Sequence, residues 1–182
     1  MAGMRIIAGE WRGRKLVAPA GATTRPTADR ARETLFSMLT SRLGGFTGLA
    51  VADLFAGSGA LGLEALSRGA ASCLFIDSDR DAINAIRANV ASLGAKGADV
   101  RQGSALNPAT VAKPFDLILL DPPYAQGDLD TLLSQLVERG WASAGTMISV
   151  ETGHGEPPAC AALTHLVRRK VGKAELHLYR MD

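Results

Sequence analysis

Asp121-Pro122-Pro123-Tyr124 is the stretch of this chain whose residue types are best suited to chemistry, and it follows the mostly apolar segment 115–120. Proline has a fixed φ and no amide hydrogen, so the two prolines are expected to end a strand and stiffen the turn. The Asp121 carboxylate can accept hydrogen bonds, and the Tyr124 ring can stack on a planar base. The stretch therefore predicts either a rigid substrate-binding turn or, on the simpler alternative, only the end of a strand.

A glycine-rich turn is the second candidate. Asp53 is followed by Gly57, Gly59 and Gly62, and the segment joins a predicted strand to a predicted helix. The glycines would let the backbone turn tightly and approach a ligand, and Asp77 ends the next predicted strand, where a carboxylate can bind ribose hydroxyls. The pattern predicts a nucleoside-binding turn, the alternative being a purely structural one.

Two cofactors fit such a turn. NAD would place a pyrophosphate over the helix N-terminus, whereas S-adenosylmethionine has no phosphate and carries a sulfonium and an amino acid end. The Asp53 carboxylate suits the cationic methionine moiety and would repel a pyrophosphate. The residues thus favour S-adenosylmethionine, with the alternative that Asp53 holds backbone amides of its own loop.

The two turns are predicted to open on one cleft, because the strand that ends at Asp121 is expected to lie beside the strand 49–55. An enzyme that methylates an exocyclic amine must localise a nitrogen lone pair that is delocalised into the base. Hydrogen-bond acceptors on the amine hydrogens do this, and Asp121 and the Pro122 carbonyl would supply them while Tyr124 holds the base in line. A dehydrogenase has no evident need for this turn, and the chemistry needs no metal.

The elements that position these turns alternate between strands and helices. Strands are predicted at 49–55, 72–77, 99–102, 115–121 and 146–151, and helices at 27–43 (with Thr27 as N-cap), 60–68, 79–93 and 128–139. Segments 163–170 and 174–179 read as a closing antiparallel hairpin. This order predicts one α/β domain, a Rossmann-like, mostly parallel sheet with helices on both faces.

The front of the chain is basic. Residues 1–42 hold eight Lys and Arg against three acids, whereas the remainder holds twelve against fifteen. Residues 1–26 are expected to form an arm with a β-hairpin that turns near Gly9, and Trp11 could stack on a base or pin the arm to the body. Such an arm predicts either an RNA-contacting surface or a solvated basic face. Its candidate substrate-binding residues are Arg5, Arg12, Arg14, Lys15 and Arg25.

Four stretches, 5–16, 25–27, 32–36 and 53–69, together with the Asp121 turn, resemble the bacterial RsmD family of 16S ribosomal RNA guanine-N2 methyltransferases. The resemblance runs nearly end to end. It implies the seven-stranded class I methyltransferase fold, S-adenosylmethionine as donor, and a guanine of 16S rRNA, naked or in an assembling small subunit, as acceptor.

The resemblance also implies roles for particular residues. Asp53, Ala56 and Gly57 would line the methionine end of the donor, Asp77 its ribose, and 121–124 the amine. Further contacts with the methyl donor are expected at Phe55, Gly59, Ser78, Ser104, Ala105 and Asp121. Many relatives carry Asp or Asn after the third strand, where this chain has Gln102-Gly103-Ser104, so Ser104 is expected to take part of that role.

Composition limits the alternatives. A 47% hydrophobic content suits a packed core. Cys73 and Cys160 do not have a metal or redox spacing, and the three histidines share no ligand spacing. With neither a leader nor an apolar run near 18 residues, a cytoplasmic monomer is expected. The competing functions are DNA adenine or glutamine amide methylation, nicotinamide-dependent oxidoreduction, and RNA binding without catalysis.

Overall fold

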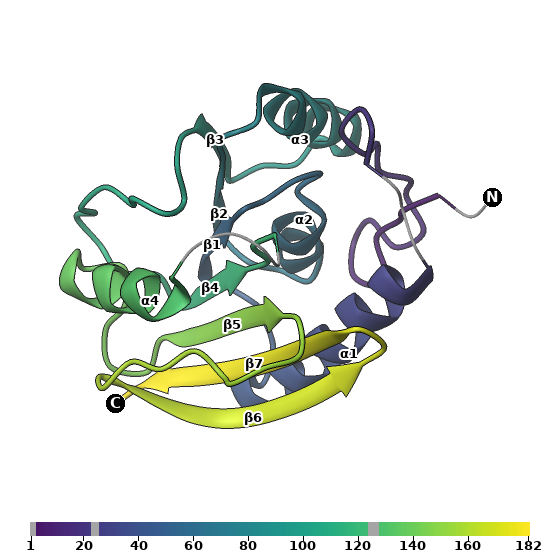
Figure 1. The fold of residues 1–182 in the computed structure, drawn as a ribbon. Helices are drawn as coiled ribbons and strands as arrows, with labels where there is room; N and C mark the ends of the chain where they lie inside the picture. Colours follow the sequence, from purple (N-terminus) through teal and green to yellow (C-terminus); the bar gives the residue numbers. More distant parts are fainter. Residues whose placement is uncertain (1–2, 23–25, 124–127) are drawn as a thin grey trace.

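The computed structural model describes residues 3–22, 26–123 and 128–182, which form one sheet flanked by helices (Figure 1). Arg25 and Tyr124 lie outside the described residues. Within these ranges, no helix is both long and apolar enough to cross a membrane. The elements, in chain order, are α1 Pro26–Leu43, β1 Ala50–Leu54, α2 Ala60–Ser67, β2 Ser72–Asp77, α3 Arg80–Leu93, β3 Ala98–Gln102, β4 Leu117–Leu120, α4 Leu129–Glu138, β5 Met147–Thr152, β6 Leu163–Val171 and β7 Ala174–Met181.

The sheet has seven strands in the order β3-β2-β1-β4-β5-β7-β6. Strands β1 to β5 pair in parallel, and β7 pairs antiparallel with both β5 and β6. The predicted parallel sheet and C-terminal hairpin are confirmed, and so is the pairing of β1 with β4. The strand order reverses between these two strands, which is where open α/β sheets bind ligands.

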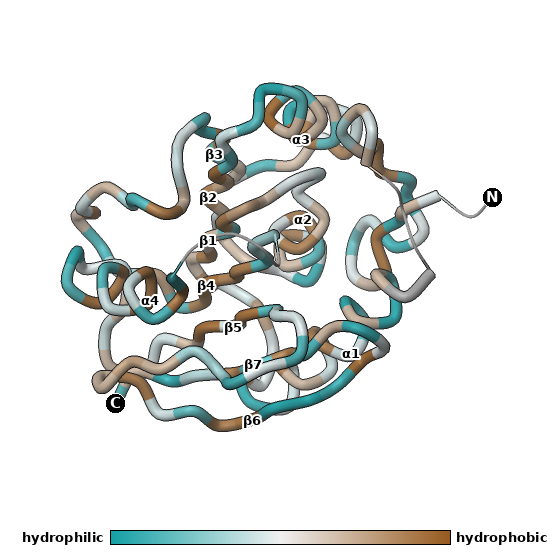
Figure 2. Tube along the Cα trace, viewed as in Figure 1, coloured by the Kyte–Doolittle hydropathy of each residue, from teal (hydrophilic) through white to brown (hydrophobic). Residues whose placement is uncertain are grey.

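Helices cover both faces of the sheet, as predicted. Apolar side chains of α1, α2 and α3 pack on one face in a cluster that includes Phe36, Leu63 and Phe75. Leu132, Leu133 and Leu136 of α4 pack on the other face. Figure 2 shows hydrophobic residues along β1, β4 and β5, whereas hydrophilic and hydrophobic residues alternate along α3. Continuous apolar strands between two helical layers are what a buried parallel sheet requires.

The expected N-terminal β-hairpin is absent from the described residues, and this prediction is wrong. Only one isolated bridge joins Arg5 to Lys15. The reason lies in α2, whose side chains take the backbone hydrogens that a hairpin ladder would need. The amides of Ile7 and Ala8 each donate to the Glu64 carboxylate at 2.9 Å, and the Trp11 amide donates to Ser67 Oγ at 3.0 Å.

The N-terminal segment is therefore a loop fixed to the body. Ile6, Trp11 and Leu16 are buried in the same core cluster as α1 and α2. Trp11 thus pins the segment and is not free to stack on a base. A smaller difference concerns α1, which begins at Pro26, so the expected cap Thr27 lies inside its first turn. Proline suits the first helical position because its missing amide hydrogen would have no partner there.

Candidate active site

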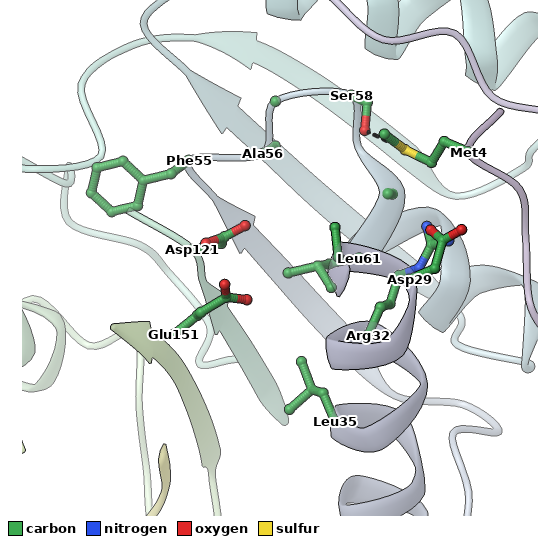
Figure 3. A pocket seen from close by; sticks show the side chains of 13 residues that line it. Met4, Asp29, Arg32, Leu35, Phe55, Ala56, Ser58, Leu61, Asp121 and Glu151 are labelled. Carbon is green, nitrogen blue, oxygen red and sulfur yellow. Dashed lines mark hydrogen bonds and ion pairs between the residues drawn. The ribbon is translucent and has the colours of Figure 1, made fainter. Parts of the chain in front are cut away.

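A cleft opens at the carboxyl ends of β1, β4 and β5 (Figure 3). It consists of two cavities that share Phe55, Gly57, Asp121 and Glu151. The α1-side cavity, about 190 Å³, is also lined by Met4, Arg32 and Leu61. The β2-side cavity, about 740 Å³, is also lined by Asp77, Ser78, Pro122 and residues 19–22. The glycine-rich turn and the Asp121 turn thus face one space.

The glycine-rich turn is held in an unusual backbone conformation. Phe55 directly follows β1 and has a φ of 59°, a left-handed value that costs a side chain about 1 kcal/mol or more. The Gly57 amide donates to the Asp77 carboxylate at 2.9 Å, and a Cβ at Gly57 would meet no atom within 4 Å. The backbone at Gly57 therefore borders open space, where a ligand can approach it closely.

The other two glycines serve packing. Gly59 is the N-cap of α2, with a φ of 79°, and a Cβ there would come 3.3 Å from Ile86 of α3. A Cβ at Gly62 would lie 2.4 Å from the Phe75 ring and 2.6 Å from Cys73 Sγ. Gly62 thus lets α2 lie against β2, and it lines neither cavity.

Asp77 and Ser78 lie where the sequence suggested, at the end of β2. One Asp77 oxygen accepts the Gly57 amide and the other accepts the Asp79 amide, both at 2.9 Å. Each carboxylate oxygen has a second lone pair, so Asp77 can accept further hydrogen bonds from a ligand. The side chain ties the turn after β1 to the turn after β2.

Asp53 lies under the glycine-rich turn and does not line either cavity. It is 1% exposed, and one carboxylate oxygen accepts the Gly62 amide at 2.9 Å. Burial, with Asp121 and Asp77 as negative neighbours, raises the pKa of Asp53 well above its usual value. The alternative that the sequence left open, a carboxylate that holds its own loop, describes this position.

Asp121 follows β4, is exposed and lines both cavities, and Pro122 after it is buried and lines the β2-side cavity. Loss of solvation in the cleft, and next the charge of Glu151, raise the pKa of Asp121 to about 7. A carboxyl group with such a pKa can both accept hydrogen bonds and exchange a proton near neutral pH. Tyr124, expected to complete this turn, lies outside the described residues.

The structure places two further charged residues at the cleft. Glu151, at the end of β5, lines both cavities. Arg32 is only 5% exposed, and its Nη2 donates to the Arg5 carbonyl at 2.5 Å and to Asp29 at 3.1 Å. Helical spacing alone could have flagged Arg32, which shares a helix face with Leu35 and Phe36. The position of Glu151, at a strand end on the ligand side, left open whether it faces the cleft.

Ala56 lines the α1-side cavity as predicted for the methionine end, whereas the remaining described residues of the predicted site line neither cavity. Ser104 is exposed in a turn, and Ala105 is buried in the core cluster under α4. The Arg14 guanidinium donates to the Ser92 carbonyl at the end of α3, at 2.7 Å. The other described residues of the basic set are, like Arg14, exposed on the N-terminal segment, namely Arg5, Arg12 and Lys15.

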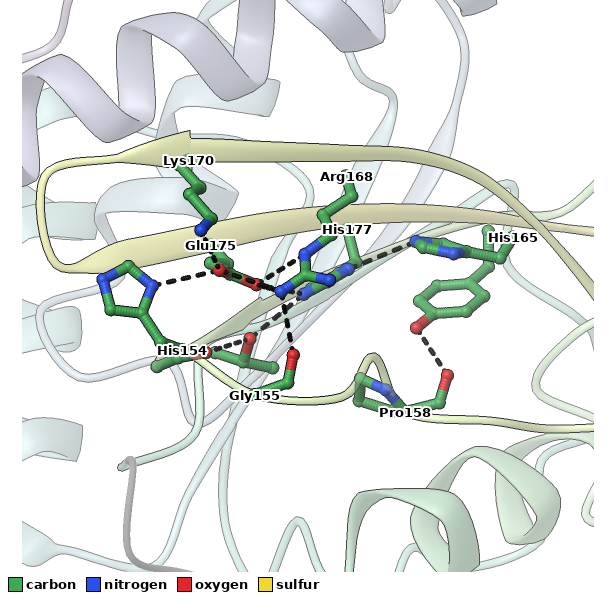
Figure 4. A network of polar contacts seen from close by, with 11 residues as sticks. His154, Gly155, Pro158, His165, Arg168, Lys170, Glu175 and His177 are labelled. Atoms are coloured by element: carbon green, nitrogen blue, oxygen red, sulfur yellow. Dashed lines mark hydrogen bonds and ion pairs between the residues drawn. The ribbon is translucent and has the colours of Figure 1, made fainter.

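A polar network supports the end of β5 (Figure 4). Glu175 is fully buried, and its Oε2 accepts a hydrogen bond from Arg168 Nε at 2.8 Å. Its Oε1 lies 3.0 Å from His154 Nδ1. Burial alone would raise the pKa of Glu175, but the hydrogen bonds from His154 and Arg168 outweigh it and hold the pKa below the usual value. Beside it, Thr152 Oγ1 lies 3.1 Å from His177 Nε2.

Among the residues that the structure places, no group of three or more His, Cys, Asp or Glu has the arrangement of a metal site.

Comparisons with known proteins agree with this architecture. A family model described as "Conserved hypothetical protein 95" matches residues 4–180. The chain is 39% identical over 182 residues to "Ribosomal RNA small subunit methyltransferase D" of Escherichia coli (strain K12), covering 98% of this chain and 90% of the relative. The structure of "Putative methyltransferase yhhF from Escherichia coli" matches with a TM-score of 0.86 and 36% identity, over 100% of this chain and 99% of that one. Magnesium protoporphyrin IX methyltransferase from Synechocystis PCC 6803, 10% identical, has the same fold, with a TM-score of 0.68 over 89% of this chain and 87% of that one.

Proposed function

The chain belongs to the RsmD family of small-subunit ribosomal RNA methyltransferases, and on this premise we propose that it transfers a methyl group from S-adenosylmethionine to the exocyclic N2 of a guanine in 16S rRNA. One observation carries the assignment of the site. The glycine-rich turn and the Asp121 turn line the same cleft and share the cavities on either side of it. S-adenosylmethionine bound at the glycine-rich turn would therefore lie beside a guanine amine bound at the Asp121 turn.

The lining of the cleft fits S-adenosylmethionine better than a dinucleotide. Asp77, Asp79, Asp121 and Glu151 line the β2-side cavity, and no Lys or Arg is found among its described lining residues. This negative surface would repel a pyrophosphate and attract a cation. When bound, S-adenosylmethionine supplies an electrophilic methyl group on a positively charged sulfur. Gly57 would lie against the methionine end, and Asp77 would accept hydrogen bonds from the ribose.

The Asp121 turn would activate the amine. Guanine N2 is a poor nucleophile because its lone pair is delocalised into the ring. The Asp121 carboxylate and the Pro122 carbonyl would each accept a hydrogen bond from the N2 amine. These bonds would localise the lone pair of N2 and direct it toward the methyl carbon. As the new N–C bond forms and the S–C bond breaks, N2 becomes cationic and loses one proton, which ionised Asp121 can accept. Tyr124 keeps its predicted role of stacking on the base.

The N-terminal segment would hold the RNA. Met4 lines the α1-side cavity and Pro19 to Ala22 line the β2-side cavity, so the segment between them borders the cleft at both ends. Arg5, Arg12, Arg14 and Lys15 are exposed on it. Their charges would pair with backbone phosphates around the target guanine.

The chain would act as a monomer with one domain, in the cytoplasm, where bacterial rRNA is made.

Loss of the gene is expected to leave one guanine of 16S rRNA without its N2 methyl group. Mass spectrometry of rRNA from a deletion strain would locate that guanine, and the purified full chain with S-adenosylmethionine should restore the methyl group on small subunits from the strain. In a thermal-shift titration, S-adenosylmethionine should raise the melting temperature, because it binds only the folded chain, and NAD should not. An unchanged rRNA modification profile would contradict the proposed substrate.

Methyl transfer is expected to increase as the pH rises through about 7, the value to which desolvation and Glu151 raise the pKa of Asp121. Below this pH the carboxyl group is protonated, so it has lost an acceptor site and cannot take the proton from N2. The ratio kcat/KM should therefore fall about tenfold per pH unit below the pKa and level off above it. A pH–rate profile measures this, and an Asp121→Asn variant, which cannot titrate, should remove the dependence.

A further inference from the structure

Glu151 and Asp121 emerge side by side from neighbouring strands. Parallel strands β4 and β5 are in register, with Leu120 opposite Val150, so the residues that follow them, Asp121 and Glu151, lie at the same level. Both residues line both cavities, and Figure 3 shows their carboxylates directed into one space, across from Leu61. The proposed amine activation uses Asp121 and leaves the second carboxylate without a role.

The position of Glu151 is fixed by its surroundings. β5 pairs with β7 as far as Thr152, the residue after Glu151, and Thr152 Oγ1 contacts the buried His177. The next loop is held by the Arg168 guanidinium, which donates to the Gly155 carbonyl at 2.9 Å and to Glu175 (Figure 4). A carboxylate that follows so constrained a strand end can act as a preorganised hydrogen-bond acceptor.

A pair of adjacent acceptors matches one base only. Guanine carries a ring N1–H beside its N2 amine, so two neighbouring donors point the same way. Adenine and cytosine carry a ring nitrogen lone pair beside their amines, so a second carboxylate would face that lone pair. We propose that Glu151 is the residue that selects guanine, by accepting a hydrogen bond from N1–H while Asp121 accepts one from the N2 amine. This inference rests on the proposed methyl transfer to guanine.

The charges in the cleft support this pairing. Two carboxylates that face one space repel each other, and the charge of Glu151 contributes to the raised pKa of Asp121. Donors from N1 and N2 of guanine would relieve this repulsion, whereas an acceptor at the ring nitrogen would add to it. A site that hydrogen-bonds a substrate N–H discriminates strongly against an analogue that lacks this hydrogen.

The test compares guanine with 2-aminopurine at the modified position of 16S rRNA, in small subunits assembled from ligated rRNA. 2-Aminopurine keeps the 2-amine but has a lone pair at N1. The wild-type chain should prefer guanine by about 100-fold in kcat/KM. In Glu151→Gln the amide can donate to that lone pair, so the preference should shrink at least tenfold. Repeating both reactions with 6-thioguanine, which keeps N1–H and the 2-amine but lacks the 6-oxygen, separates the effect of N1 from that of the 6-oxygen: the wild-type chain should prefer it to 2-aminopurine.

Glu156→Gln is the matched control, because Glu156 is exposed in the loop after β5 and outside both cavities. It should keep the wild-type preference. If Glu151→Gln slows transfer to guanine and to both analogues by the same factor, the role in base selection is refuted. If the wild-type chain methylates none of these substrates, the proposed function itself fails and the inference falls with it. A thermal melt of each variant verifies folding before the kinetic comparison.

Discussion

Replacing Asp121 with alanine is expected to lower the rate of methyl transfer by about 1000-fold while the affinity for S-adenosylmethionine stays within a few fold. The variant removes the carboxylate that would accept the amine hydrogen and the departing proton. It leaves intact the turn around Gly57 and its hydrogen bond to Asp77, at 2.9 Å, on which donor binding would depend. Single-turnover kinetics and calorimetric titration with S-adenosylmethionine measure the two effects separately.

Two further variants sharpen this experiment. Asp121→Asn keeps one acceptor oxygen in nearly the same place, so part of the activity should remain at every pH. Asp99→Ala removes an exposed carboxylate of β3 that pairs with Arg101 and lies outside both cavities, and it should change neither rate nor affinity. Unchanged transfer in Asp121→Ala would rule out the proposed activation. An equal loss of donor affinity would assign Asp121 to donor binding instead.

Replacing Gly9 with alanine is expected to detach the N-terminal segment from α2. Gly9 has a φ of +89°, and a Cβ there would lie 2.0 Å from the Ser67 carbonyl oxygen, at the end of the helix. The same carbonyl accepts the Glu10 amide at 2.8 Å, so relief of the clash breaks this hydrogen bond. The combined loss should be about 3 kcal/mol in the free energy of unfolding.

Gly13→Ala is the control for this prediction. Gly13 has a φ of +80°, but a Cβ there would meet no atom within 4 Å, so only the backbone strain of about 1 kcal/mol remains. Chemical denaturation measures the stability of both variants. RNA binding as a function of salt concentration should weaken and flatten in Gly9→Ala only, because the exposed basic residues lose their fixed place. Equal losses in both variants would show that the contact with Ser67 contributes nothing.

Apart from the N-terminal hairpin, the sequence by itself determined the order and type of the elements, and the boundaries of those predicted strands and helices agree with the structure to within two residues. The signals are local: apolar runs of strand length, helical spacing, and turns rich in glycine or proline. It also brought the turns at Gly57 and Asp121 together, because a parallel sheet entered at β1 has few permitted strand orders. The roles of Arg25 and Tyr124 rest on the sequence alone, because both residues lie outside the described part of the structure.

Only the tertiary structure decided which charged side chains line the cleft and which form hydrogen bonds that stabilise the fold. Glu64 is fully buried and accepts two backbone amides from the N-terminal segment, which is why no hairpin forms there. Asp53 is buried beneath the turn that it was expected to serve, and Glu151 stands beside Asp121. The physical reason is that the partner of a carboxylate depends on which distant segment packs against it. The spacing of residues along the sequence does not predict which distant segment that will be.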